Sequence, residues 1–322
     1  MQNELVAPVM EWIEWSDALE RAKDWLDGIH ALMVADGRQI TTHMETLHRG
    51  LALLHRKWDR EEWRVFCLDV ARGHPLRDVL HQCPFTRHGF ERPRGYAGDA
   101  ALIDYLYTER CTARLTPQGK RLYHFMYQGP SPQSVRERRQ LLSEEIDATA
   151  ARVHQPRILS VACGHLREAE HSRAVAEGRV GELIAFDQDE LSLQEVSRKH
   201  PRDAVRTVCG SVRSILQGRT RFEPMDLIYS AGLYDYLAEG TAQRLTRLLF
   251  ENLRPGGRLV LGNFAHCPEV GYLEAFMDWW LVYRNEAQMQ ALLAELPADH
   301  LAEQRMFCDG GRNVIYLVLT RR

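Results

Sequence analysis

The chain has 322 residues, of which 45% are hydrophobic and 26% are charged, and its formal net charge at pH 7 is −3. These values are typical of a globular protein with enough residues for one large domain or two ordinary ones. A charge so close to neutral gives no reason to expect nucleic acid as a partner, and it favours chemistry on a small molecule.

No apolar stretch approaches the roughly 18 residues of a membrane span, and residues 1–14 lack the basic start and apolar run of a secretory signal. We therefore expect no membrane span and a cytoplasmic protein. The seven cysteines form no closely spaced pair, which argues against a disulfide framework and against a zinc site or any other metal site. We interpret them as reduced thiols.

Residues 16 to about 129 carry apolar side chains at the three- and four-residue steps of amphipathic helices. One stripe includes Trp25 and Ile29, a second surrounds Leu53 and Leu54, and a third spans residues 63–80. We therefore predict an all-helical N-terminal region.

Two segments interrupt this helical pattern. The run from Cys83 to Asp99 is rich in Pro and Gly, so we predict an ordered loop there. The clearest break is Gly129 to Pro132, and a helix from about Ser134 to Arg152 is predicted after it.

After Pro156 short apolar strands alternate with polar, helix-like stretches, which is typical of a parallel sheet covered by helices on both faces. The last two strands have no long helix between them and indicate an antiparallel hairpin joined through Asp309 to Gly311. The predicted strands are Arg157–Ala162, Leu183–Asp187, Val205–Cys209, Met225–Ser230, Gly257–Asn263, Gln304–Phe307 and Asn313–Thr320.

Open parallel sheets bind ligands at the carboxyl ends of their strands, and four candidate segments directly follow predicted strands. Gly164 lies in the segment Ala162 to Glu168 after the first strand and allows the backbone to approach a ligand closely. Asp187 ends the second strand, where a carboxylate can hold ribose hydroxyls. Gly210 to Val212 form a polar turn that can read an adenine edge, and the segment Tyr229 to Tyr236 would lie beside the reacting group.

In these segments, and in the turn Leu253 to Gly257, the chain resembles the class I S-adenosylmethionine-dependent methyltransferases over about residues 156–322. The resemblance implies an α/β fold with a Rossmann-like seven-stranded sheet, mostly parallel with an antiparallel C-terminal hairpin. It implies a cofactor-binding domain over residues 131–322, and we expect the helical domain, residues 1–130, to cover the active site.

The glycine-rich loop departs from the family pattern. The usual acid-x-Gly-x-Gly-x-Gly is Ser160 to Leu166 here, so one glycine remains and the leading acid is absent. The missing Gly-x-Gly-x-x-Gly also argues against a dinucleotide, because a pyrophosphate needs that close backbone approach. A nicotinamide oxidoreductase and a non-catalytic cofactor-binding protein nevertheless remain as alternatives.

The resemblance implies S-adenosyl-L-methionine as the cofactor. The loop after the first strand would hold its amino-acid part, the acid ending the second strand its ribose, and the next turn its adenine. The candidate cofactor residues are Ala162, Cys163, Gly164, Asp187, Gln188, Gly210, Ser211, Val212, Ser230, Ala231 and Gly232, with Tyr96, Asp99 and Arg136 from outside the sheet region.

A narrower resemblance rests on Arg94 to Asp99, Ser134 to Arg139, Ala162 to Glu168 and Ser230 to Leu237. Together these segments resemble bacterial methyltransferases of 3-hydroxy fatty-acid methyl ester signal synthesis. This resemblance implies carboxyl O-methylation of a 3-hydroxy fatty acid. N-, O- or C-methylation of a small amine, phenol or amino acid in specialised metabolism is the alternative.

A carboxylate acceptor needs no base, whereas an ammonium or hydroxyl group must lose a proton. The candidate catalytic residues are Tyr234, Asp235 and His266 at strand ends, and Tyr96 in the Gly-Tyr-Ala-Gly-Asp loop, which with Asp99 is a candidate lid. Asp99 is alternatively a helix cap.

Two further segments are candidates for the acceptor side. The aromatic stretch 276–284 is a candidate acceptor pocket, with Trp280, Tyr283 and Arg284 as substrate-binding residues. Core packing or a homodimer contact is the alternative for this stretch. The segment 110–139 is rich in arginine, and most of these arginines are interpreted as a solvated helix face.

Overall fold

The computed structural model describes residues 15–108, 115–201 and 204–322. The chain divides into two compact units, which we call the helical unit (residues 1–133 and 267–280) and the sheet unit (residues 134–266 and 281–322). Among the described residues no helix has both the length and the apolar character needed to cross a membrane.

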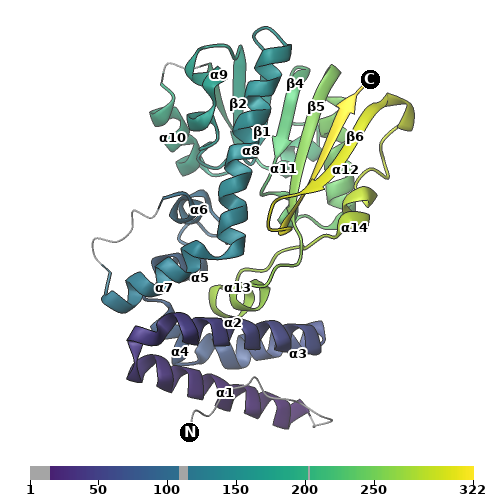
Figure 1. The fold of residues 1–322 in the computed structure, drawn as a ribbon. Coiled ribbons are helices and arrows are strands. Elements are labelled where there is room, and N and C mark those ends of the chain that lie inside the picture. Colours follow the sequence, from purple (N-terminus) through teal and green to yellow (C-terminus); the bar gives the residue numbers. More distant parts are fainter. Residues whose placement is uncertain (1–14, 109–114, 202–203) are drawn as a thin grey trace. The chain divides into compact units, whose positions relative to one another are not determined.

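The helical unit is built from amphipathic helices and is completed by α13, which comes from a distant part of the sequence and packs against α2 and α5 (Figure 1). Every residue of α13 is buried. The helices of this unit are α1 (Trp15–Ala35), α2 (Ile40–Lys57), α3 (Arg60–Val65), α4 (Leu76–Leu80), α5 (Pro84–Glu91), α6 (Ala100–Tyr107), α7 (Pro117–Gln128) and α13 (Val270–Met277).

Three predictions for the helical region need correction. Residues 84–91 are helical, because Pro84 fits the first helical position and Phe85, Thr86 and Gly89 are buried, so only residues 92–99 form the loop. The helix predicted from Ser134 begins at Pro130, again with proline in its first turn. Leu53 is 49% exposed and lies outside the buried stripe of α2.

The sheet unit holds seven strands in the order β3-β2-β1-β4-β5-β7-β6. All neighbouring strands are parallel except the pairs that involve β7. The predicted Rossmann-like sheet with an antiparallel C-terminal hairpin is therefore confirmed. The strands are β1 (Arg157–Val161), β2 (Glu182–Asp187), β3 (Val205–Cys209), β4 (Met225–Ser230), β5 (Leu253–Phe264), β6 (Leu301–Cys308) and β7 (Val314–Arg321).

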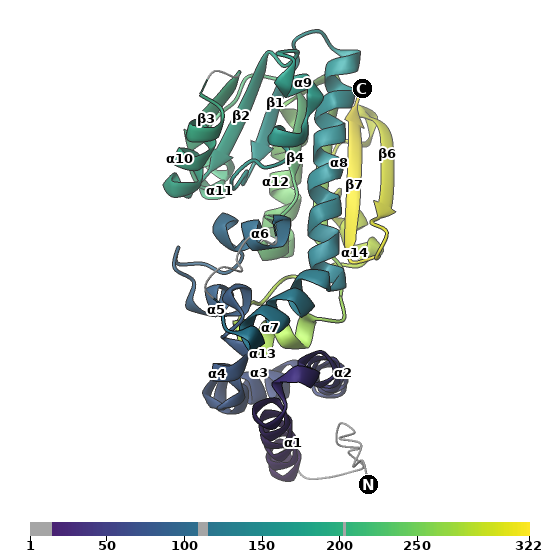
Figure 2. The same cartoon turned by 60° about the vertical axis from the view of Figure 1, so that its left-hand side comes forward.

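Helices cover both faces of the sheet (Figures 1 and 2). Successive strand residues point to opposite faces, so Ile158 packs with Leu142 and Ile146 of α8, whereas Leu159 packs with Leu245 and other residues on the opposite face. Both faces are therefore apolar cores, which explains the continuous apolar strands of the sequence. The helices of this unit are α8 (Pro130–Arg152, from residue 134), α9 (Arg173–Ala176), α10 (Glu190–Lys199), α11 (Val212–Leu216), α12 (Glu239–Glu251) and α14 (Glu286–Ala291).

Candidate functional site

The sheet changes direction between β1 and β4: the chain moves from β1 to β2 and β3 on one side, and from β4 to β5 on the other. The carboxyl ends of β1 and β4 are joined by the Ser230 hydroxyl, which donates to the Val161 carbonyl at 2.9 Å. In this class of fold such a switch point forms a crevice that binds ligands. The segments predicted for the cofactor after β1, β2, β3 and β4 therefore meet at one edge of the sheet.

The loop after β1 keeps a glycine-like backbone with only one glycine. Ala162, Gly164 and Leu166 have φ values of +57°, +53° and +52°, and these are the three positions at which the family pattern has glycine. A residue with a Cβ atom pays roughly 1–2 kcal/mol for this left-handed conformation. Such a conformation persists where the surroundings enforce it, which is common at binding sites.

The Asp187 carboxyl group joins the loops after β1 and β2. Its two oxygen atoms accept hydrogen bonds from the backbone amides of Gly164 (2.8 Å) and Asp189 (2.9 Å). Burial raises the pKa of Asp187, although these amide hydrogen bonds act in the opposite direction. Each carboxylate oxygen has two lone pairs, so the group retains acceptor capacity for ribose hydroxyls.

The loop after β3 is tied to the same strand end, because the Gly210 amide donates to the Asp187 carbonyl at 2.9 Å. A Cβ atom at Gly210 would lie 2.7 Å from the Phe186 ring, so a larger residue would displace the turn. Ser211 and Val212 are half-buried and Gln188 is exposed. These residues are therefore accessible to solvent at the carboxyl ends of β2 and β3.

The loop after β4 contacts a buried arginine, Arg138, that was not among the predicted site residues. The Arg138 guanidinium of α8 is 8% exposed and donates to the Ala231 carbonyl. Its nitrogen atoms lie 3.6 and 3.8 Å from the position of a Cβ atom at Gly232. Arg136, which was predicted to bind the cofactor, is only half-buried on the same helix.

The signal for Arg138 was present in the sequence. Arg138 follows Val135 by three residues and precedes Leu142 by four and Ile146 by eight, and all three apolar residues are buried. An arginine on the apolar stripe of a helix needs a polar partner, and here that partner is a carbonyl group at the switch point. Most arginines of the segment 110–139 were interpreted as a solvated face, which is wrong for the buried Arg138. Arg110 and Arg114 lie outside the described residues.

A second unforeseen pair lies in the core beneath the loop after β1. The Tyr229 hydroxyl donates to Glu168 Oε1 at 2.8 Å, and both side chains are buried. Burial raises the pKa of Glu168, which the Tyr229 hydrogen bond and the Arg138 charge partly offset. Burial also raises the pKa of Cys163, so its thiol stays neutral and is not a nucleophile.

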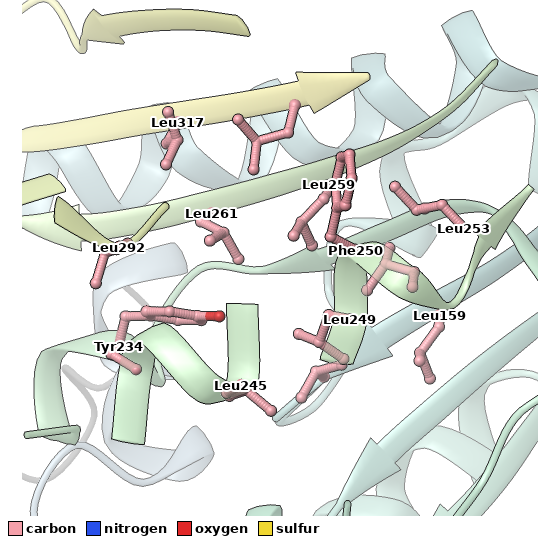
Figure 3. Close-up of a cluster of buried hydrophobic side chains, with 14 of the residues drawn as sticks. Leu159, Tyr234, Leu245, Leu249, Phe250, Leu253, Leu259, Leu261, Leu292 and Leu317 are labelled. Atoms are coloured by element: carbon pink, nitrogen blue, oxygen red, sulfur yellow. The ribbon is translucent and has the colours of Figure 1, made fainter. Parts of the chain in front are cut away.

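The prediction that Tyr234 is catalytic is not supported. Its ring is fully buried among the leucines of the core, as Figure 3 shows, and its hydroxyl lies 3.0 Å from Thr246 Oγ1. Burial raises the pKa of Tyr234, so the hydroxyl remains protonated. Tyr236 is instead the exposed tyrosine of this loop, at 42%.

Arg284, predicted to bind substrate, is also buried and holds the protein backbone. Its guanidinium donates to the carbonyls of Tyr234 (2.6 Å) and Leu237 (2.5 Å) and to Asn263 Oδ1 (2.5 Å). The guanidinium thus donates three hydrogen bonds to groups of the protein itself. We therefore assign Arg284 a structural role in place of the predicted contact with substrate.

Asp235 lies beside this network and is 3% exposed. Its Oδ1 accepts from the Phe264 amide at 2.6 Å. Burial raises the pKa of Asp235 to about 6, against the opposing effects of that hydrogen bond and of Arg138 and Arg284. The carboxyl group is therefore close to titration near neutral pH.

The other predicted residues are distributed over both units. In the sheet unit His266 is exposed, and its ring lies 5.8 Å from that of the half-buried Tyr283. Trp280 belongs to the helical unit, where its indole nitrogen donates to Asp278 at 2.7 Å. The aromatic stretch 276–284 is thus divided between the two units.

The Gly-Tyr-Ala-Gly-Asp loop belongs to the helical unit. Asp99 caps α6 by accepting from the Leu102 amide at 2.8 Å, and it also pairs with His88 Nε2 at 2.8 Å. Burial would raise the pKa of Asp99, but His88 and the helix amide outweigh it and lower the pKa. Asp99 therefore has the capping role given as its alternative, and Tyr96 is half-buried in the loop.

No protein-family model matches the chain, and no curated protein matches its sequence. A solved structure from Bordetella parapertussis, named as a possible exported protein, is similar over 88% of this chain and 96% of its own, with a TM-score of 0.60 and 18% identity. This likeness shows a shared fold over most of the chain.

Two solved methyltransferase structures are more distant. NodS, an N-methyltransferase from Bradyrhizobium japonicum in complex with S-adenosyl-L-homocysteine, has a TM-score of 0.42 and 17% identity, over 58% of this chain and 87% of its own. A TehB-like S-adenosylmethionine-dependent methyltransferase from Corynebacterium glutamicum has a TM-score of 0.40 and 19% identity, over 60% of this chain and 98% of its own.

Proposed function

We propose that the chain is an S-adenosylmethionine-dependent methyltransferase that acts on a small molecule. The observation that carries the proposal is the backbone of the loop after β1, in which all three positions of the family's glycine pattern are left-handed although two are not glycine. A plain turn between a strand and a helix has no need for this repeated conformation.

The residues at the sheet edge fit the three parts of the cofactor. Asp187 would accept from the ribose hydroxyls, Gly210 to Val212 would contact the adenine, and Ala162 to Gly164 would approach the amino-acid part. The bound cofactor would supply an electrophilic methyl group on a sulfonium. The protein would then orient the acceptor and exclude water, because positioning supplies much of the rate in such a displacement.

For the acceptor we propose the carboxylate of a 3-hydroxy fatty acid. The support is the narrow sequence resemblance, together with the burial of Tyr234, which removes one of the predicted bases from the site. A carboxylate is already nucleophilic at neutral pH and needs no proton removal. We also propose a cytoplasmic location, because the seven cysteines form no closely spaced pair in the sequence, as expected of thiols in a reducing compartment.

The first experiment is calorimetry of the full chain with S-adenosylmethionine, S-adenosylhomocysteine and NADH. We expect binding of the first two only, and binding of NADH alone would overturn the proposal. In Asp187→Asn the affinity for S-adenosylhomocysteine should fall roughly tenfold to a hundredfold, as expected for lost hydrogen bonds to a charged group. Glu190→Gln, an exposed neighbour, is the matched control.

The second experiment tests the acceptor. Methyl-labelled cofactor is incubated with the protein and with 3-hydroxydecanoic or 3-hydroxyhexadecanoic acid, and the product is identified by mass spectrometry. We expect a methyl ester. Labelling of a phenol or an amine in parallel reactions, without labelling of either acid, would contradict the acceptor while leaving the methyltransferase proposal in place.

A further inference from the structure

The loop after β4, residues 231–237, is held by two buried arginines from different parts of the chain. Arg138 of α8 donates to the Ala231 carbonyl at its beginning. Arg284 donates to the carbonyls of Tyr234 and Leu237 in its second half. Each guanidinium is less than one tenth exposed, at 8% and 4%.

The two buried guanidinium groups donate hydrogen bonds to neutral carbonyl groups, which do not balance their positive charges. A negative charge is needed nearby, because an uncompensated buried charge is strongly unfavourable. Asp235 supplies one from within the held loop, and the buried Glu168 carboxyl group also interacts with the Arg138 charge. The charges of both Arg138 and Arg284 act on the Asp235 carboxyl group, and the Phe264 amide donates to it at 2.6 Å from β5. Glu239 acts on Arg284 in turn.

We propose that Arg138 and Arg284 are positioning residues for the cofactor: they clamp the loop after β4 by its carbonyl groups and so fix the Asp235 carboxyl group against the Phe264 amide of β5. The inference rests on the proposed function and extends it to regulation of the same site by pH. The positioning acts through the loop, and neither arginine needs to touch the cofactor.

The ionised carboxyl group has a consequence for ligand choice. S-adenosylmethionine carries one positive charge more than S-adenosylhomocysteine, and charges act over several ångströms in a site of low dielectric. An ionised Asp235 therefore favours the sulfonium substrate over the thioether product. Burial also raises the pKa of Asp187 and of Glu168, so the whole edge becomes less negative as the pH falls.

The experiment measures the dissociation constants of S-adenosylmethionine and S-adenosylhomocysteine by calorimetry between pH 5 and 8. In the wild type we expect the preference for S-adenosylmethionine to increase with pH and to change most near pH 6, where the Asp235 carboxyl titrates. In Asp235→Asn this part of the pH dependence should disappear, because asparagine keeps an acceptor for the Phe264 amide without the charge.

The arginine variants separate charge from geometry. Arg138→Met removes a cation that favours the charged form of Asp235. The midpoint, the pH at which the preference for S-adenosylmethionine changes most, should therefore rise by roughly one pH unit or more. Arg138→Lys keeps the charge and should keep the midpoint, but a lysine has no planar donor pair and should bind both ligands several-fold more weakly. The control is Arg152→Met on the same helix, whose guanidinium donates to the Ala148 carbonyl within α8.

The outcomes are distinct. A wild-type protein that binds neither ligand overturns the proposed function itself. A wild type that binds both, with Arg138→Met and Asp235→Asn showing wild-type affinities and midpoints, overturns only the present inference. If thermal melting shows that Arg138→Met does not fold, Arg138→Lys and Asp235→Asn still decide the question, because lysine should retain the midpoint that asparagine abolishes.

Discussion

The replacement of Asp235 by asparagine tests the electrostatics of the sheet unit without any ligand. The folded protein raises the pKa of this carboxyl from 3.8 to about 6. A difference of about two units corresponds to about 3 kcal/mol between the two protonation states. Because the folded-state pKa is the higher one, the folded protein binds the proton more tightly, and stability falls as the pH rises from about 4 to about 6.

We therefore expect the free energy of unfolding of the wild type, relative to Asp235→Asn, to fall by about 2.5 kcal/mol between pH 4 and pH 7, most of the full difference. Urea unfolding followed by far-ultraviolet circular dichroism measures this difference. Tryptophan fluorescence is an internal control, because the six tryptophans of the described residues all belong to the helical unit. A difference that is constant with pH, or that grows as the pH rises, would refute the reasoning.

Four further substitutions probe the loops. Ala162→Gly removes the Cβ atom that disfavours the left-handed backbone at this position. The unfolding free energy in a urea titration should rise by up to about 1 kcal/mol, because the greater freedom of glycine in the unfolded chain offsets part of the gain. A clear loss of stability would show that the loop is not strained. Asp99→Ala removes the cap of α6 and should lower stability by roughly 0.5–2 kcal/mol, and an unchanged melting temperature would argue against the cap. Tyr234→Phe should lower the free energy of unfolding by about 1 kcal/mol through the lost contact with Thr246, and it should leave turnover unchanged. Tyr236→Phe should leave the free energy of unfolding unchanged. The opposite pattern would restore Tyr234 as a catalytic candidate.

The sheet was predictable because each of its strands carries its own signal. β3 and β4 both have the predicted bounds. Every residue of β4 is buried, as in a strand covered on both faces, whereas β3 is half-buried to exposed at the edge of the sheet. β5 begins four residues earlier than expected, at Leu253 instead of Gly257, because proline and glycine at its start indicated a turn. α5 was missed for the same reason: composition indicated a loop, but burial of Phe85 and its neighbours determined the helix.

The positions of the candidate cofactor segments in the fold were also predictable, because each directly follows a strand and the strands end at one edge. The direction of individual side chains was not, since it depends on partners far away in the sequence. Tyr234 and Tyr236 lie two residues apart, yet one is in the core and the other is exposed. For Arg138 the helical spacing indicated burial, but its acceptor, the Ala231 carbonyl, lies 93 residues away and could not be read from the sequence.

The passage of residues 267–280 into the helical unit has a consequence for how the chain folds. The eight residues of α13 are all buried in that unit, although they follow β5 in the sequence. During synthesis from the N-terminus, α1 to α7 are complete long before α13 leaves the ribosome. We therefore expect the helical unit to acquire its final core only after five strands of the sheet have been made, so a protein ending before residue 267 would expose the surface that α13 covers.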